Sequence, residues 1–377
     1  MKIEKLVLKD FRCYSYLEFS PSDSVTVLYG SNGTGKTSIL EAISYLATTR
    51  SHRTSKDSEL VKWGASGFAL SALVIKHGRR SSIDMRYAEG RGREITLDGT
   101  YGKKAGEILG KLNAVRFSPE DLDIIKGGPA HRRRFLDMEI SQMAEGYYST
   151  LLQYNRALLQ RNAVLKMDAS TRTRRELLPA WDHQLIQFGL RLISERVSFI
   201  RELDGHAADI HRRISTGKER LALQYCCSLG TPPGADVPDV RQYEEALNSS
   251  TEEDLIKRST SVGPHRDDIM ILTNGYDIRT YGSQGQQRTA AMAIRIAQVN
   301  VVENFTGETP ALLLDDVSSE IDASRQEMLM DELTDRCQTI ITCTDPSGLH
   351  LARGLQKLVY EVGGGTVLLR EVSSCSS

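Results

Sequence analysis

The chain of 377 residues is 40% hydrophobic and 26% charged, an ordinary globular composition that excludes disordered, collagen-like and disulfide-framework classes. Its 48 Lys and Arg side chains balance 49 Asp and Glu side chains, so the net charge of −1 indicates neither nucleic acid nor a membrane. The six cysteines form no CxxC pair and no apolar run reaches ~18 residues, so we expect a soluble cytoplasmic protein without signal peptide or membrane partner.

The first 115 residues are expected to form mostly β-strands, because apolar residues alternate with polar ones. One helix is expected at about 35–49, directly after a strand and a glycine-rich loop. The predicted strands are 6–11, 16–20 and 24–30, followed by a three-stranded meander of 68–78, 82–90 and 93–99.

Between about 119 and 217 the apolar residues recur at spacings of three and four instead of two. This period predicts two antiparallel helices of ~30 residues, each ~45 Å long, around a polar break at 168–175. A loop at 229–239 and a helix at 244–260 are expected to follow.

The last third of the chain returns to mixed strands and helices. The expected elements are an Asn-Gly hairpin at 267–278, a helix at about 285–304, strands at 311–316 and 339–343, a helix at about 324–333, and a hairpin at 359–372. Strand patterns near both ends of the chain predict an α/β head built from residues 1–118 and 255–377, with a helical lobe inserted at 119–254.

A phosphate-binding loop is the strongest local signal. The residues are Gly30, Ser31, Asn32, Gly33, Thr34, Gly35, Lys36 and Thr37, which fit G-x-x-x-x-G-K-[ST] between an apolar strand and a helix. The loop amides would surround nucleotide phosphates, Lys36 would reach the β and γ phosphates, and the Thr37 hydroxyl would bind Mg²⁺. The alternative, a chance glycine turn, is disfavoured by the flanking strand and helix.

Two acids, Asp315 and Asp316, end the apolar strand that begins at Ala311. Carboxylates are costly in a core unless they emerge at the carboxyl end of a strand, where ligands bind to open α/β sheets. We expect Asp315 to hold Mg²⁺ and Asp316 to polarise the attacking water; capping of a following helix is the alternative for Asp316.

A second anion site is predicted where Ser283, Gln284 and Gly285 open a helix. Ser283 would either cap that helix or donate to a phosphate. With the phosphate loop, the acidic strand and the segment 318–322, this segment resembles the signature motif of ABC-type ATPase heads. The resemblance implies that ATP is held between two copies, with Ser283 of one copy reaching the γ-phosphate bound by the other, so that Lys36, Asp316 and Ser283 act together.

Within that superfamily the chain resembles the RecF family of recombination mediators, because of the stretches 50–57, 117–122, 132–137 and 263–268. The resemblance runs from residue 1 to about 372. It implies a cytoplasmic protein that binds ATP and DNA, forms an ATP-dependent homodimer and hydrolyses ATP slowly. It also implies work with RecO and RecR to load RecA at gaps and stalled forks.

The chain departs from the superfamily pattern in three places. Asp316 stands where transporter subunits carry Glu, no Gln stands between Lys36 and Gln142 to serve as the Q-loop glutamine, and no switch histidine follows the strand 339–343. Glu120 or Asp121 could replace the glutamine. A nucleotide-binding subunit of an ABC transporter is the alternative function, and these departures disfavour it.

Local charge differs strongly from the neutral total. Residues 156–175 carry six basic and one acidic side chain, and 76–93 carry six and two, whereas 236–256 and 308–335 have net charges of −6 and −8. The basic run is either a solvated helix face or a phosphate-binding surface for duplex DNA, at single-strand junctions. The candidate DNA contacts are Arg156, Arg161, Lys166, Arg172, Arg174 and Arg175.

Overall fold

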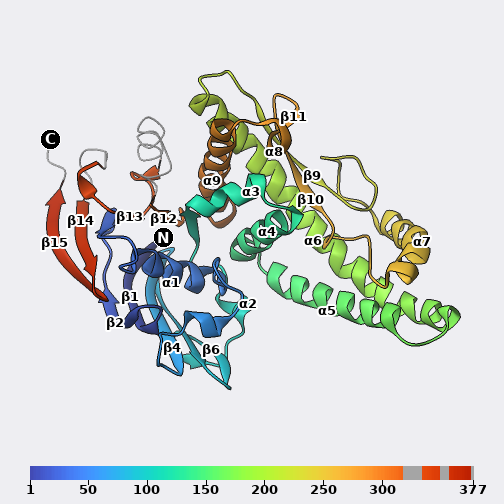
Figure 1. Cartoon of the computed structure of the whole chain (residues 1–377), viewed down its shortest axis with the longest axis horizontal. Coiled ribbons are helices and arrows are strands. Elements are labelled where there is room, and N and C mark those ends of the chain that lie inside the picture. Colours follow the sequence, from blue (N-terminus) through green and yellow to red (C-terminus); the bar gives the residue numbers. More distant parts are fainter. Residues whose placement is uncertain (317–332, 349–355, 375–377) are drawn as a thin grey trace. The chain divides into compact units, whose positions relative to one another are not determined.

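The computed structural model describes residues 1–316, 333–348 and 356–374 (Figure 1). These residues form two compact units. The first combines Met1–Asp121 with Ile294–Ser377, and the second is Leu122–Ala293. The predicted division placed residues 255–293 with the terminal segments, whereas in the structure they belong to the compact unit that contains the helices.

The first unit contains an antiparallel sheet with strand order β2-β1-β4-β5-β6-β7. Alternation explains its strands: in β4, Phe68, Leu70, Ala72 and Val74 are buried and the residues between them are partly exposed. The predicted meander is therefore confirmed. The strands are β1 Lys2–Phe11, β2 Tyr14–Phe19, β4 Gly67–Lys76, β5 Arg79–Ala88, β6 Gly92–Leu97 and β7 Thr100–Tyr101.

A second sheet in this unit has the order β15-β14-β3-β13-β12-β8, and all its neighbouring pairs are parallel except β14 with β15. All five residues of β12 and of β13 are buried, as in parallel strands covered on both faces. The strands are β3 Val25–Tyr29, β8 Ala114–Phe117, β12 Ala311–Asp315, β13 Thr339–Cys343, β14 Gln356–Gly363 and β15 Thr366–Ser374.

Helix α1 (Lys36–Thr48) lies between the two sheets, because it contacts β4 and β5 of one and β8, β12 and β13 of the other. Twelve of its thirteen residues are buried, as this position requires. The short helix α2 (Ala105–Ile108) precedes β8. The phosphate loop thus joins β3 to a helix that is fixed on both sides.

The second unit is mainly helical and adds a sheet of order β11-β10-β9. Its hairpin turns at Asn274 and Gly275, both with positive φ, as an Asn-Gly turn requires. The elements are α3 Asp123–Lys126, α4 Pro129–Met143, α5 Tyr147–Lys166, α6 Thr171–Ile214, β9 Leu221–Cys226, α7 Val240–Lys257, β10 Asp268–Thr273, β11 Tyr276–Asp277 and α8 Ile278–Tyr281. Helix α9 (Gln284–Thr306) continues into the first unit.

The two predicted helices of ~30 residues are wrong in length. The first is divided into α4 and α5, because the chain turns at Gly146, which has φ 82°. The second, α6, has 44 residues and is about 66 Å long. Ser170 caps α6 by accepting a hydrogen bond from Thr173 N at 3.1 Å, so the helix includes most of the expected polar break. Figure 1 shows α5 and α6 as an antiparallel pair, as predicted.

The other predicted strands and helices of the described residues are confirmed, with small shifts of their ends. Strand β9 was not predicted, although its residues alternate between buried and partly exposed. The segment 318–322 and nearly all of the predicted helix at 324–333 lie outside the described residues. Among the described helices, none has both the length and the apolar character needed to cross a membrane.

Candidate nucleotide site

The phosphate loop has a backbone that only glycine accommodates at two positions. Gly30 has φ 154°, and a Cβ atom there would lie 2.3 Å from the Val362 carbonyl oxygen. Gly35 has φ 109°, and a Cβ atom would lie 2.5 Å from Cys13 Sγ. The loop therefore packs tightly against β14 and the β1–β2 turn, which leaves its open side for a ligand.

Lys36, the first residue of α1, points its ammonium group back along this loop. Its Nζ donates to the carbonyl oxygens of Gly30 at 2.6 Å and Ser31 at 2.8 Å. Burial lowers the pKa of Lys36, while Asp316 and other nearby groups act in the opposite direction. An ammonium has three donors, so one remains for an oxygen of a bound phosphate.

Thr37 and Asp315 meet although 278 residues separate them in the sequence. The Thr37 hydroxyl donates to Asp315 Oδ1 at 2.9 Å, and the Thr342 hydroxyl of β13 donates to the same oxygen at 2.8 Å. Burial raises the pKa of Asp315, and the two hydroxyl groups partly offset this effect. A hydroxyl and a carboxylate in contact are the oxygen ligands that Mg²⁺ prefers, so these residues fit a magnesium site.

Asp316 follows β12 in a left-handed conformation with φ 50°, which Asp tolerates better than most residues. Its backbone N–H donates to Thr342 Oγ1 at 3.0 Å. This turn directs the chain away from the strand immediately after Asp315. Both acids line the same cavity as the phosphate loop.

That cavity has a volume of about 480 Å³. Besides the loop, α1 and the two acids, it is lined by residues that the sequence analysis did not single out as ligands. They are Arg12, Cys13, Arg53, Glu59, Val61, Trp63 and Thr342. Only Arg53 falls within a family-like stretch, 50–57. The others come from the β1–β2 turn, the segment 59–63 and β13. Two of them carried a signal in the sequence: Trp63 is an aromatic residue beside a turn glycine, and Thr342 is a polar residue near the end of a predicted strand.

Arg12 is held in place by a buried carboxylate. Glu41 of α1 accepts from Arg12 Nε at 2.8 Å and from Nη2 at 2.7 Å, and also from Ser51 Oγ at 2.5 Å. The Glu41 side chain is fully buried, so Arg12 neutralises a charge that would otherwise be costly. This pair joins the β1–β2 turn to α1.

The two candidates for the missing glutamine differ in their surroundings. Asp121 is buried and accepts from Arg295 Nη2 at 2.7 Å and from Ser118 N at 2.8 Å. Glu120 is more exposed, pairs with Arg116 at 3.3 Å, and contributes to raising the pKa of Asp315.

Ser283 belongs to the second unit and caps α9. Its Oγ accepts from Gln286 N at 3.3 Å, and Gln286 Oε1 accepts from Ser283 N at 2.8 Å. Ser283, Gln284 and Gly285 are all exposed. The structure thus places them at an open helix N-terminus, where backbone N–H groups attract anions.

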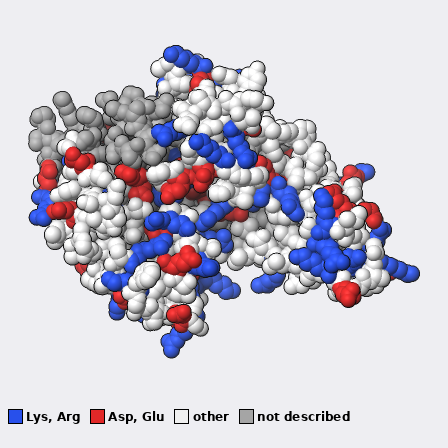
Figure 2. All heavy atoms as spheres, in the orientation of Figure 1, with Lys and Arg blue, Asp and Glu red and all other residues white. Residues whose placement is uncertain are grey.

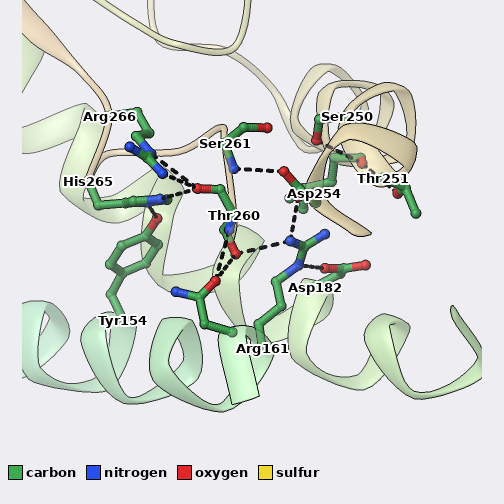
Figure 3. A network of polar contacts seen from close by, with 12 residues as sticks. Tyr154, Arg161, Asp182, Ser250, Thr251, Asp254, Thr260, Ser261, His265 and Arg266 are labelled. Carbon is green, nitrogen blue, oxygen red and sulfur yellow. Dashed lines mark hydrogen bonds and ion pairs between the residues drawn. The ribbon is translucent and has the colours of Figure 1, made fainter. Parts of the chain in front are cut away.

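Arg161, predicted as a DNA contact, is instead fully buried, and Figure 3 shows its guanidinium between Asp182, Asp254 and Thr260. Its Nε donates to Asp182 at 2.6 Å, and its Nη1 donates to Asp254 at 2.6 Å and to Thr260 Oγ1 at 3.0 Å. The prediction was wrong because Arg161 lies on the inner face of α5, in line with Tyr154. Its guanidinium joins α5, α6, α7 and the segment that follows α7.

The remaining basic candidates lie at or near the surface of the α5–α6 hairpin end. Figure 2 shows Lys and Arg side chains gathered there, with acidic side chains among them. Arg172 pairs with Glu176, Arg175 pairs with Glu252, and Arg174 donates to the Leu165 carbonyl oxygen. Arg156 and Lys166 are exposed.

Two of the family-like stretches, 132–137 and 263–268, meet within the second unit. Arg132 forms a bidentate ion pair with Asp268, in which Nε donates to Oδ1 at 2.7 Å and Nη2 donates to Oδ2 at 2.9 Å. Arg133 Nη1 donates to the Asp267 carbonyl oxygen at 2.8 Å. Buried Arg196 links them by bonding Asp137 and the Pro264 carbonyl oxygen. These stretches stabilise the fold of this unit.

Comparison with known proteins agrees with this architecture. The model of the RecF/RecN/SMC N terminal domain matches residues 2–365. A protein named DNA replication and repair protein RecF from Lachnospira eligens is 42% identical over 91% of this chain and 93% of its own. The RecF of Halalkalibacterium halodurans is 37% identical over 97% and 99%.

Solved structures give the same result. One of a recombination mediator protein, RecF-ATP in the RecFOR pathway, is 35% identical, covers 98% of this chain and 97% of its own, and superposes with a TM-score of 0.88. An SMC head bound to the C-winged helix domain of ScpA shares the fold alone, with 17% identity, coverage of 99% and 98%, and a TM-score of 0.56. The fold is thus that of an ABC-type ATPase head with an inserted helical unit, and the chain belongs to the RecF family.

Proposed function

We propose that this protein is an ATP-dependent DNA-binding protein of recombinational repair. The observation that carries the proposal is the meeting of Lys36, Thr37 and Asp315 in one cavity, at the carboxyl edge of a parallel sheet. The names of the relatives, which refer to DNA replication and repair and to RecF-ATP, support the choice of nucleotide and process. A transporter subunit has no such support.

Each residue has a separate role in the proposed site. The loop from Gly30 to Gly35 surrounds the phosphates with backbone amides, and Lys36 neutralises the β and γ phosphates. Thr37 and Asp315 hold Mg²⁺, which supplies charge neutralisation at the phosphates when bound. Asp316 polarises the attacking water; because its side chain is shorter than the usual Glu, hydrolysis is slow and ATP acts as a switch.

A second copy of the chain completes the site. Ser283, Gln284 and Gly285 stand at an exposed helix N-terminus, which suits the γ-phosphate bound by the other copy. ATP would then join two copies, and hydrolysis would release them. The dimer would place two basic hairpin ends on one DNA, so that weak contacts add up.

The proposed DNA surface consists of the basic candidates without Arg161. Arg156, Lys166, Arg172 and Arg175 are exposed, and Arg174 is partly buried. Contacts of this kind read the phosphate backbone rather than the bases. We therefore expect this protein to bind duplex DNA next to single-stranded gaps. RecO, RecR and RecA would act with it there, in the cytoplasm.

Two substitutions test the proposal. The oligomeric state of each variant is measured by size-exclusion chromatography with and without ATP. Lys36→Met should abolish ATP binding and ATP-dependent dimerisation while the fold stays intact. Ser283→Arg should keep ATP binding by the monomer and block dimerisation, because the added cation fills the γ-phosphate contact. Ser249→Arg, an equal change at an exposed position of α7, is the matched control and should dimerise normally.

The outcomes separate the parts of the proposal. A Lys36→Met protein that still dimerises with ATP would refute the nucleotide-held dimer. Loss of ATP binding in monomeric Ser283→Arg would place Ser283 in the site of its own chain. Equal DNA affinity with and without ATP would refute the switch.

A further inference from the structure

Trp63 presents an aromatic ring to solvent beside the nucleotide cavity. Its side chain is 97% exposed, although a tryptophan normally buries a large apolar surface. It lines the cavity that also contains Lys36, Thr37 and Asp315. Loop and ring belong to the same compact unit, so their relative position is fixed by the fold.

The segment that carries Trp63 is anchored by Lys62, the residue before the ring, and is closed by a turn after it. Lys62 N donates to the Asp10 carbonyl oxygen at 2.8 Å, and Lys62 Nζ donates to Ser15 Oγ at 2.6 Å. Ala65 N donates to the Lys62 carbonyl oxygen at 3.0 Å, which closes a turn through Gly64 with φ 85°. The ring is thus exposed on a backbone that bonds to β1 and β2 through Lys62.

We propose that Trp63 is the stacking surface for the base of the nucleotide whose phosphates the loop binds. The proposal rests on the proposed nucleotide site and adds which residue recognises the base of the nucleotide. The loop and Lys36 recognise phosphate, so they do not distinguish ATP from inorganic polyphosphate. A ring at another wall of the cavity supplies the contact for an aromatic base, and it favours purines because they stack over a larger area.

The test compares ADP with tripolyphosphate, which lacks a base. ADP has no γ-phosphate, so its binding does not depend on a second copy. In calorimetry with the full chain, Trp63→Ala should weaken ADP binding roughly 5- to 150-fold, the usual contribution of one stacked base. Binding of tripolyphosphate should not change. Trp63→Phe should restore part of the ADP affinity, and Tyr101→Ala, which removes another exposed aromatic ring, should change neither ligand.

Fluorescence gives a second readout, because Trp63 and Trp181 are the only two tryptophans of the chain. In a Trp181→Phe protein, ADP should quench the remaining emission and tripolyphosphate should not. Unchanged ADP affinity in Trp63→Ala, or an equal loss for both ligands, would overturn the proposal; the first result would point to a protein or DNA contact. If the unaltered chain binds neither ligand, the nucleotide site itself is refuted together with this proposal.

Discussion

Replacing Arg161 by Met separates a structural role from a DNA-binding role. The substitution leaves the Asp254 carboxylate, whose side chain is fully buried, without its cation, and removes the bond to Asp182. Breaking a buried ion pair by removing one partner typically costs about 3–5 kcal/mol. The lost hydrogen bond to Thr260 acts in the same direction. We therefore expect the free energy of unfolding of the helical unit to fall by about 3–5 kcal/mol.

The assay uses Trp181, which packs against the cluster of Val164, Leu165, Leu178 and Leu255 beside Asp182. In a Trp63→Phe background its fluorescence reports urea unfolding of this region of the full chain. Arg156→Ala, an exposed change on the same helix, is the control and should alter stability by no more than about 0.5 kcal/mol. A stable Arg161→Met protein with weakened DNA binding would refute the reasoning and return Arg161 to the DNA surface.

Three further predictions concern backbone space and pH. Gly35→Ala should abolish nucleotide binding, because the added Cβ atom would meet Cys13. Gly33→Ala should weaken nucleotide binding less, because the Cβ atom there meets nothing within 4 Å. Equal nucleotide-binding curves for the two variants would contradict this reasoning. Burial raises the pKa of Asp315 in the folded protein. Ionisation of Asp315 is therefore less favourable in the folded than in the unfolded chain, and the free energy of unfolding falls as pH rises through the raised pKa. Asp315→Asn should therefore raise the Tm of the ligand-free protein at pH 7 but not at pH 3, and a lower Tm at pH 7 would contradict this. Burial lowers the pKa of His265 in the folded protein to about 4. As pH falls, His265 is therefore protonated in the unfolded chain before it is protonated in the folded chain. Stability, followed through Trp181, should fall by up to about 3 kcal/mol between pH 6.5 and 4, and His265→Gln should flatten this fall; an equally steep fall in the variant would show that other groups cause it.

The contact between Thr37 and Asp315 could be predicted because two local rules combine. A glycine loop between a strand and a helix places Thr37 at the carboxyl end of β3, and an apolar run that ends in acids places Asp315 at the carboxyl end of another strand. Parallel strands bring these ends to one edge. The partner Thr342 could have been noted too, since it is a polar residue near the carboxyl end of a buried strand.

The burial of Arg161 was also within reach of the sequence. On α5 the buried positions Leu151, Tyr154, Ala157 and Arg161 recur every three or four residues, so Arg161 lies on the apolar stripe. Counting charges along the chain missed this, because it ignores the helical period. The exposure of Trp63 was different: it depends on hydrogen bonds to Asp10 and Ser15, which no local pattern of the sequence encodes.

The strand order of the parallel sheet has a consequence for synthesis. Val25 of β3 pairs with Thr339 of β13, 314 residues later (339 minus 25). At about 5–20 residues per second, a ribosome needs roughly 16–60 s to supply that partner. During this interval β3 has neither β13 nor β14 beside it, and the whole of Leu122–Ala293 is made before the interval ends. The inserted unit can therefore fold first, and Asp315 reaches the phosphate loop only near the end of translation, so a truncated chain cannot assemble the site.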